Sequence, residues 1–283
     1  MIKTYYLLTK PGIIFGNAIT ILGGFALASK GHIDYWLLLA TVIGLSLVVA
    51  SACVFNNYID RHLDEKMART KNRALVKGTI SVRNALFFAT FLGLFGGLIL
   101  ALYTNLLALL VAAIGFFVYV VLYGMCKLRS VYGTELGSIA GGVPPVVGYC
   151  AVSNRLDVGA LILFMIVVLW QMPHFFAIAV YRFKDYAAAA IPVLPVKKGM
   201  YVTKVHMVVY TIAFIIANLM LTLCGYTGYA YMIVAALLGG TWLWMNIRGF
   251  QSNNDTLWAR KMFLFSLVVI TGLCIMIPID VIC

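Results

Sequence analysis

Three oxygen-bearing side chains recur at four-residue intervals between positions 56 and 64. On a continuous helix, Asn56, Asp60 and Asp64 are offset from one another by only about 40° and so form one stripe. Carboxylate and amide oxygens are the ligands that Mg²⁺ prefers, and Mg²⁺ commonly bridges one or two carboxylates to the phosphates of a substrate. The stripe therefore predicts a site for a divalent metal.

Basic residues follow the stripe, with Arg69, Lys71 and Arg73 alternating with polar residues. This order suits a site in which a metal binds the acids and the cations hold the remaining phosphate oxygens. The alternative is an acidic helix end that a basic loop neutralises at a membrane surface. The amides of Asn56 and Asn57 favour a functional site, because polar groups at membrane depth are costly and usually functional.

The composition requires a membrane around these residues. Of 283 residues, 63% are hydrophobic and 11% are charged, and the mean hydropathy is +1.00. Soluble globular proteins have roughly 45–50% apolar and about 25% charged residues. A cytosolic enzyme, a disordered chain and a secreted disulfide scaffold are therefore excluded, and we expect an all-α, polytopic membrane protein.

Apolar runs of about 20 residues predict nine transmembrane helices in one bundle. Their expected bounds are roughly Gly12–Ser29, Tyr35–Ile59, Asn84–Tyr103, Asn105–Met125, Leu136–Ser153, Val158–Tyr181, Val205–Gly225, Gly228–Ile247 and Met262–Val281.

The distribution of basic residues predicts how this bundle is oriented. All 21 Lys and Arg residues except Lys30 and Arg155 fall at the N-terminus or in the loops after the second, fourth, sixth and eighth spans. Because cytoplasmic loops retain Lys and Arg, the N-terminus is predicted to be cytoplasmic and the C-terminus periplasmic, in a bacterial inner membrane.

The net charge of +12 then lies at the cytoplasmic face, where anionic lipid headgroups or an anionic substrate can meet it. We expect the lipid bilayer as a partner and no nucleic acid, because the basic residues lie on short loops without a recognised binding module. Residues 1–283 are expected to form a single domain, with cytoplasmic active-site loops at about 60–83 and 182–204.

Further segments carry a family resemblance. N-x-x-x-D-x-x-x-D followed by R-T-K-N-R resembles the first motif of the UbiA-type intramembrane prenyltransferases. The resemblance to the haem O synthase branch of that superfamily covers essentially the whole chain. It is carried by T-K-P-G-I-I-F-G-N at 9–17, G-G-V-P-P-V-V-G-Y at 141–149, W-Q-M-P-H-F at 170–175, R-F-K-D-Y at 182–186 and I-P-V-L-P at 191–195.

The resemblance implies a set of site residues and Mg²⁺ as the cofactor. It assigns the metal to Asn56, Asp60 and Asp64, with Asp185 from a second acidic motif. That motif is reduced, because Ala189 stands where a second acid would be, and Asp185 could instead only pair with its basic neighbours. The expected diphosphate-binding cations are Arg69, Lys71, Arg73, Lys127, Arg182 and Lys184.

His174 is the candidate for contact with haem. It follows Pro173 well inside an apolar span, and a proline there frees a carbonyl, which membranes tolerate beside a cavity. His174 therefore either lines a haem pocket or makes an interhelical hydrogen bond.

By resemblance, the chain transfers a farnesyl group from farnesyl diphosphate to a vinyl group of haem B, with addition of water, to give haem O. An association with haem-copper oxidase assembly factors also belongs to this expectation. The alternatives are a prenyltransferase for another acceptor such as a quinone precursor, a non-catalytic haem-handling membrane protein, and a transporter. A transporter would place charges near the bilayer midplane, whereas these acids cluster at one face.

Overall fold

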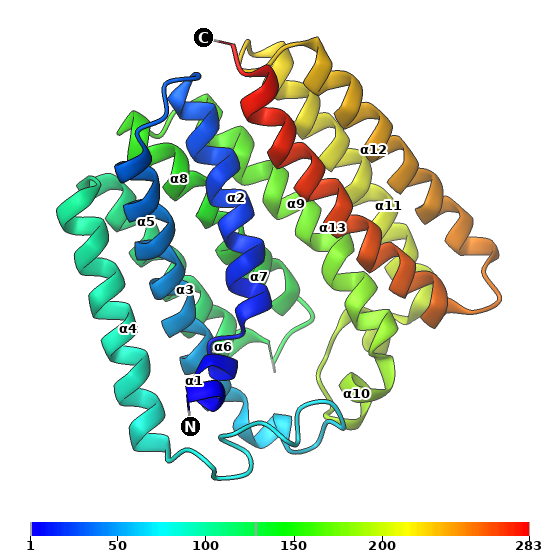
Figure 1. Ribbon diagram of the computed structural model, residues 1–283. Coiled ribbons are helices and arrows are strands. Elements are labelled where there is room, and N and C mark those ends of the chain that lie inside the picture. The colour runs from blue at the N-terminus through cyan, green and yellow to red at the C-terminus, as the bar shows by residue number, and fades with distance from the viewer. Residues whose placement is uncertain (1, 128, 283) are drawn as a thin grey trace.

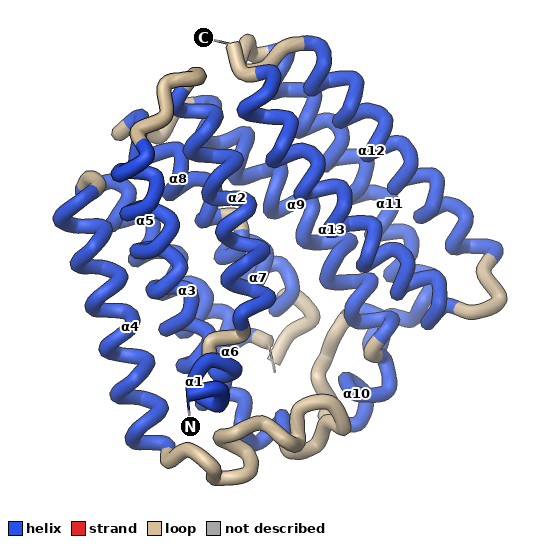
Figure 2. Tube along the Cα trace, in the orientation of Figure 1, coloured by secondary structure: helices blue, strands red, loops and turns tan. Residues whose placement is uncertain are grey.

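The chain folds into a bundle of helices in the computed structural model, which describes residues 2–127 and 129–282 (Figure 1). Over those residues the only β pairing is a single bridge between Thr227 and Val281 (Figure 2). The elements in order are α1 (Ile2–Leu8), α2 (Pro11–Ser29), α3 (Tyr35–Asp64), α4 (Val82–Tyr103), α5 (Leu106–Phe117), η1 (Val118–Tyr123), α6 (Gly124–Cys126), α7 (Gly133–Gly141), α8 (Val143–Ser153), α9 (Val158–Tyr181), α10 (Phe183–Ala188), α11 (Leu194–Leu223), α12 (Tyr229–Arg248), η2 (Gly249–Gln251) and α13 (Asp255–Asp280).

The prediction of nine spans is confirmed for the described residues, in which nine helical segments are long and apolar enough to cross a membrane. The fourth combines α5, η1 and α6, the fifth combines α7 and α8, and the eighth combines α12 and η2. The two ends of the chain lie at opposite ends of the bundle in Figure 1, as an odd number of spans requires.

Two of the predicted helix starts are too late. The seventh span begins at Leu194 rather than Val205, because Pro195 lies in the first turn of α11, where a missing N–H is tolerated. A break in α11 follows at Gly199, whose φ is +86°. The ninth span begins at Asp255, because the side chain of Asn254 accepts a hydrogen bond from the backbone N–H of Leu257 and caps the helix.

The helices form two groups that meet at the fifth and sixth spans. In Figure 1, α2, α3, α4, α5 and α8 lie on one side, and α9, α11, α12 and α13 on the other. Backbone contact joins α2 to α8: a Cβ added at Gly24 would lie 1.9 Å from the carbonyl oxygen of Pro145, and one at Gly148 would lie 2.3 Å from that of Ile21. The glycines around Pro144 and Pro145 therefore serve close helix packing.

One end of the bundle gathers the segments that carry the predicted site. At the lower end in Figure 1, the C-terminal end of α3 lies near α1 and α6, and the loop after α3 runs across toward α10. Segments that are far apart in the sequence are therefore brought together at this end.

Candidate functional site

The helix α3 continues through Asp64, so the three predicted ligands do share one helix face. Asn56 is 4% exposed and Asp64 is 2% exposed, while the side chain of Asp60 is 16% exposed. These side chains therefore point into the protein and not toward lipid or bulk solvent. Each of these three side chains pairs with a cation from a different segment of the chain.

Asn56 is held by Lys10, which the sequence analysis did not select. The Lys10 Nζ donates a hydrogen bond to Asn56 Oδ1 at 2.6 Å. Beside it, Asn57 Nδ2 donates to the backbone carbonyl of Leu8 at 2.8 Å, which ties the segment before α2 to the end of α3. The pKa of Lys10 is lowered to about 8, chiefly by burial; the charges of Arg73 and Lys127 also lower it, while Cys53 and Asp60 partly offset this.

Asp60 is held by Lys127, whose Nζ pairs with Asp60 Oδ1. The side chain of Lys127 is 10% exposed and its Nζ lies 5.3 Å from the centre of the Tyr123 ring. A Cβ at Gly133 would lie 2.7 Å from the Cα of Lys127, so only glycine lets the start of α7 pack against this residue. Lys127 is therefore locked in place by its surroundings.

Asp64 is held by Arg73, whose Nη1 lies 2.5 Å from Asp64 Oδ2. The loop between them folds back on itself, because Thr70 Oγ1 donates to the carbonyl of Asp64 at 3.0 Å and the Arg73 N–H donates to the carbonyl of Thr70 at 2.9 Å. One arginine of the predicted basic motif, Arg73, thus pairs with Asp64, the last acid of the stripe.

The donor set suits a hard divalent cation that is shared with a phosphate. Among the described residues, no three His, Cys, Asp or Glu side chains lie close enough to hold a metal by themselves. Two carboxylates and one amide leave several coordination positions to be filled, and Mg²⁺ characteristically fills such positions with water and phosphate oxygens. The surrounding Lys and Arg groups supply the charge that a diphosphate needs.

The second predicted loop approaches the first at Tyr186 in α10. The charges of Arg69 and Asp60, and those of Asp185 and Arg182, all act on the Tyr186 phenol, whose pKa is raised by burial. The phenol thus remains protonated at neutral pH and can donate a hydrogen bond. Asp185 takes part in none of the ion pairs found among the described residues, so no direct pair with Arg182 or Lys184 is present there.

Two predicted cations stay outside the cluster. Lys71 and Lys184 are exposed, and neither makes a side-chain hydrogen bond or ion pair within the part of the chain that the structure describes. Arg69 is also exposed but lies near enough to α10 for its charge to act on Tyr186.

A π-helical turn, η1, forms the aromatic side of the site. Such turns are rare and are often found at functional sites. Tyr119 and Tyr123 from this turn stack with ring centroids 5.4 Å apart and an angle of 22° between the planes. Because Tyr123 also lies beneath Lys127, the ring faces adjoin the ion pair at Asp60.

His174 lies in the contact between α9 and α13. Its Nδ1 is 2.7 Å from Ser266 Oγ, and its ring stacks on Trp170 with centroids 4.7 Å apart. The Trp170 Nε1 donates to the carbonyl of Ser266 at 2.8 Å, and Phe263 lies 5.1 Å from the His174 ring. The interhelical hydrogen bond that the sequence left open as one alternative is therefore present, and it engages one of the two ring nitrogens.

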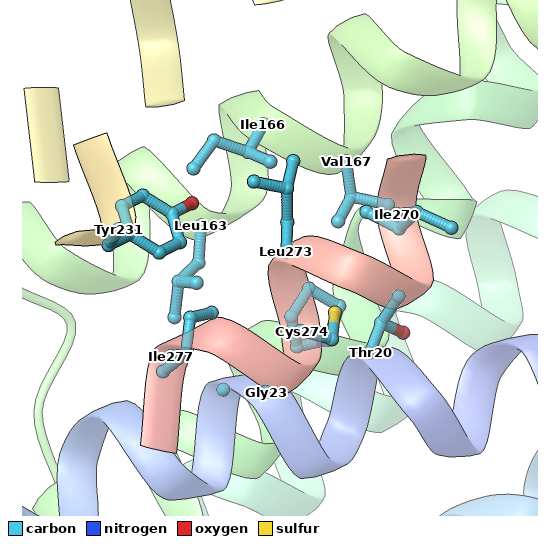
Figure 3. A pocket seen from close by; sticks show the side chains of 12 residues that line it. Thr20, Gly23, Leu163, Ile166, Val167, Tyr231, Ile270, Leu273, Cys274 and Ile277 are labelled. Carbon is cyan, nitrogen blue, oxygen red and sulfur yellow. The ribbon is translucent and has the colours of Figure 1, made fainter. Parts of the chain in front are cut away.

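The pocket in Figure 3 lies elsewhere, between α2, α9 and α13. Its walls are apolar side chains such as Ile166, Leu273 and Ile277, and its volume is about 10 Å³. A cavity needs roughly 10–15 Å³ and several polar partners to hold one water, so this pocket is a small packing gap and not a substrate site.

The chain is similar in sequence to known proteins. The sequence profile of the UbiA prenyltransferase family matches residues 17–268. The chain is 59% identical to a protoheme IX farnesyltransferase of Edwardsiella ictaluri (strain 93-146) and 60% identical to one of Serratia proteamaculans (strain 568), in each case over 99% of this chain and 95% of the relative.

Solved structures share the fold. One, described as giving insight into the biosynthesis of digeranylgeranylglyceryl phosphate synthase in membranes, has a TM-score of 0.79 at 20% identity and covers 98% of this chain and 97% of its own. A UbiA homologue from Archaeoglobus fulgidus bound to GPP and Mg²⁺ has a TM-score of 0.73 at 15% identity and covers 97% of this chain and 99% of its own. The profile match, together with the relatives at 59% and 60% identity, shows that the chain belongs to the UbiA prenyltransferase family.

Proposed function

We propose that this protein is a Mg²⁺-dependent enzyme that transfers the farnesyl group of farnesyl diphosphate to a vinyl group of haem B and adds water, giving haem O. The observation that carries the proposal is the stripe of Asn56, Asp60 and Asp64 with one cation against each oxygen. The choice of haem as acceptor and of farnesyl as the transferred group rests on the relatives at 59% and 60% identity, which are named protoheme IX farnesyltransferase.

The chain's own residues would act first on the diphosphate. Asn56, Asp60 and Asp64 would hold Mg²⁺, and Asp185 would ligate a second ion; the metal would neutralise the leaving group and withdraw electrons from the bond that breaks. Arg73 and Lys127 would contact the phosphate oxygens from two sides, with Arg69, Lys71, Arg182 and Lys184 contributing positive charge around them. This electrostatic stabilisation of the departing diphosphate is the main source of rate.

The reaction then balances as one substitution and one addition. The C1–O bond of the farnesyl group breaks, and its electron pair leaves with the diphosphate. The outer carbon of the haem vinyl group forms a bond to farnesyl C1, which puts positive charge on the inner vinyl carbon. A water oxygen adds there and loses a proton. The stacked rings of Tyr119 and Tyr123 would face the first cation and stabilise it by cation–π attraction.

Chelation tests the metal. We expect purified protein given haem B and farnesyl diphosphate to form no haem O with excess EDTA, and to recover when Mg²⁺ is returned in excess, because an unscreened diphosphate is a poor leaving group. Mass analysis should find haem carrying one farnesyl group plus one water. Conversion of a quinone precursor but not haem would instead favour the alternative acceptor, and undiminished turnover in EDTA would defeat the metal assignment.

His174 is proposed to contact the haem, with Ser266 fixing its ring. We expect His174→Ala to change the absorption spectrum of bound haem, whereas Ser266→Ala removes the same hydrogen bond yet leaves the ring beside Trp170. Both variants should lower the melting temperature to a similar extent, since both break this interhelical bond. Identical haem spectra in the two variants would assign His174 to helix packing alone.

We also propose the orientation and the setting in the cell. The bundle would be one domain in a bacterial inner membrane, with its N-terminus, the stripe and both active-site loops on the cytoplasmic side, as the positions of Lys and Arg support. Because haem O would carry a long apolar chain, transfer to haem-copper oxidase assembly factors within the membrane is proposed. Labelling of single cysteines in intact cells, and co-purification, test these two points.

A further inference from the structure

Asn56 differs from the two acids in how many oxygens it offers. Lys127 engages Oδ1 of Asp60, and Arg73 engages Oδ2 of Asp64, so each carboxylate keeps a second oxygen for another ligand. An amide has a single oxygen, and Lys10 Nζ already lies 2.6 Å from that of Asn56. Of the three pairs, that of Lys10 is therefore the one in which the cation and a metal would have to share a single oxygen.

The backbone at Lys10 is fixed, so only its side chain can move. Leu8 and Thr9 are 3% and 8% exposed, and Leu8 accepts the hydrogen bond from Asn57. The Thr9 hydroxyl donates to the carbonyl of Tyr6 at 2.7 Å, and Lys10 itself has a φ of +53° directly before Pro11. These contacts hold the backbone of this segment against the end of α3, so we expect the ammonium group to move by side-chain rotation.

A divalent ion on Asn56 would meet this ammonium at short range. Oxygen ligands lie about 2.0–2.1 Å from Mg²⁺, so a metal and an ammonium on one oxygen would be about 4 Å apart and would repel each other strongly. The nearby positive charges of Arg73 and Lys127 also disfavour the ammonium, whereas the Asp60 carboxylate favours it. With Asp60 engaged by Lys127 and, under the proposed function, by the metal, a phosphate oxygen is the group left to receive the displaced ammonium.

Resting on the proposed function, we propose that Lys10 couples the binding of metal to the binding of diphosphate. Its ammonium leaves Asn56 for a phosphate oxygen when the two bind together, and it opposes the metal when diphosphate is missing. The metal and the diphosphate therefore bind synergistically, and loss of pyrophosphate after the reaction returns Lys10 to Asn56 and weakens the hold on the metal.

Two binding measurements on the full-length protein in detergent test this coupling. The first is binding of Mn²⁺ alone, followed by electron paramagnetic resonance, and the second is binding of radiolabelled pyrophosphate at a fixed, high Mg²⁺ concentration. For Lys10→Met we expect Mn²⁺ alone to bind about tenfold more tightly. Pyrophosphate should bind about tenfold or more weakly, since a charge-assisted contact is lost.

The coupling is supported if Lys10→Met binds Mn²⁺ more tightly and pyrophosphate more weakly than the wild type. Weaker pyrophosphate with unchanged Mn²⁺ binding would reduce Lys10 to a simple phosphate ligand, and weaker binding of both would make it structural; each outcome overturns the proposal. If Lys10→Met does not fold, Lys10→Gln, which can still donate to Asn56, carries the same test with the same expected signs.

The control is Lys3→Met, the same change at an exposed lysine in the neighbouring α1, which should leave both affinities unchanged. The wild-type protein separates this inference from the proposed function. A wild type that binds neither Mn²⁺ nor pyrophosphate defeats the metal site itself and the coupling with it. A wild type that binds both, with Lys10→Met unchanged, defeats only the coupling.

Discussion

Asp60→Asn is expected to lower the rate of haem O formation by at least about a hundredfold while the protein still folds. The change removes a charge that is proposed to bind the metal, and loss of one preorganised electrostatic contact typically costs 10²–10³-fold in rate. Asn keeps the size of the side chain and an oxygen that can accept from Lys127, so the buried ammonium keeps a partner. Turnover per folded protein, measured with haem B and farnesyl diphosphate, checks this. Asp64→Asn, which keeps an oxygen for Arg73, should behave alike.

A second Lys–Asp pair provides a matched control. Lys204 Nζ lies 2.5 Å from Asp255 Oδ1, at the contact of α11 with α13, and the two side chains are 9% and 31% exposed. Asp255→Asn makes the same chemical change in a pair that has no part in the proposed chemistry. It should lower the melting temperature and leave turnover near that of the wild type. Equal losses of turnover in the two variants would mean that both pairs act through folding alone.

Gly24→Ala is expected to prevent α2 from packing on α8 and to destabilise the protein by about 3 kcal/mol or more, at the upper end of what overpacking costs. The added Cβ would lie 1.9 Å from the carbonyl oxygen of Pro145, and 3.0 Å from its Cα. These are backbone atoms, so no rotation of a side chain relieves the clash. Tryptophan fluorescence during heating in detergent, and gel filtration for aggregation, measure the effect.

The comparison is Gly16→Ala, in the same helix two turns earlier. A Cβ there meets no atom within 4 Å, and Gly16 is exposed. Because alanine favours helix over glycine by about 1 kcal/mol, this variant should be neutral or slightly more stable than the wild type. If both variants are equally stable, the backbone contact between α2 and α8 does not hold the bundle together.

Much of the fold follows from local rules and was predictable. Apolar runs of membrane length specify the spans, and a four-residue repeat on a helix that runs through Asp64 specifies which side chains share a face. The late predicted start of α11 had a local cause too: charged and proline residues between 192 and 204 suggested a loop, whereas Pro195 occupies a first turn that accepts it.

The partners within the site could not be predicted in the same way. Lys10 and Asn56 are 46 residues apart, and His174 and Ser266 are 92 apart, so no periodicity connects them. Each pairing depends on how whole helices pack, which in turn depends on close contacts such as that of Gly24 with Pro145. A lysine directly before the first apolar span was the one available signal for Lys10, but positive residues at that position are also expected from topology.

The order in which the cations occur along the chain has a consequence for biosynthesis. Asp60 is translated 67 residues before Lys127, and two further spans separate them. While the ribosome makes those spans, the end of α3 carries a carboxylate whose counter-ion has not yet been synthesised. A truncated product that stops after the third span would hold the acids and two of the cations, yet it would lack Lys127 and the aromatic turn beside it. The ion pair at Asp60 therefore cannot form during translation before the fourth span has been made.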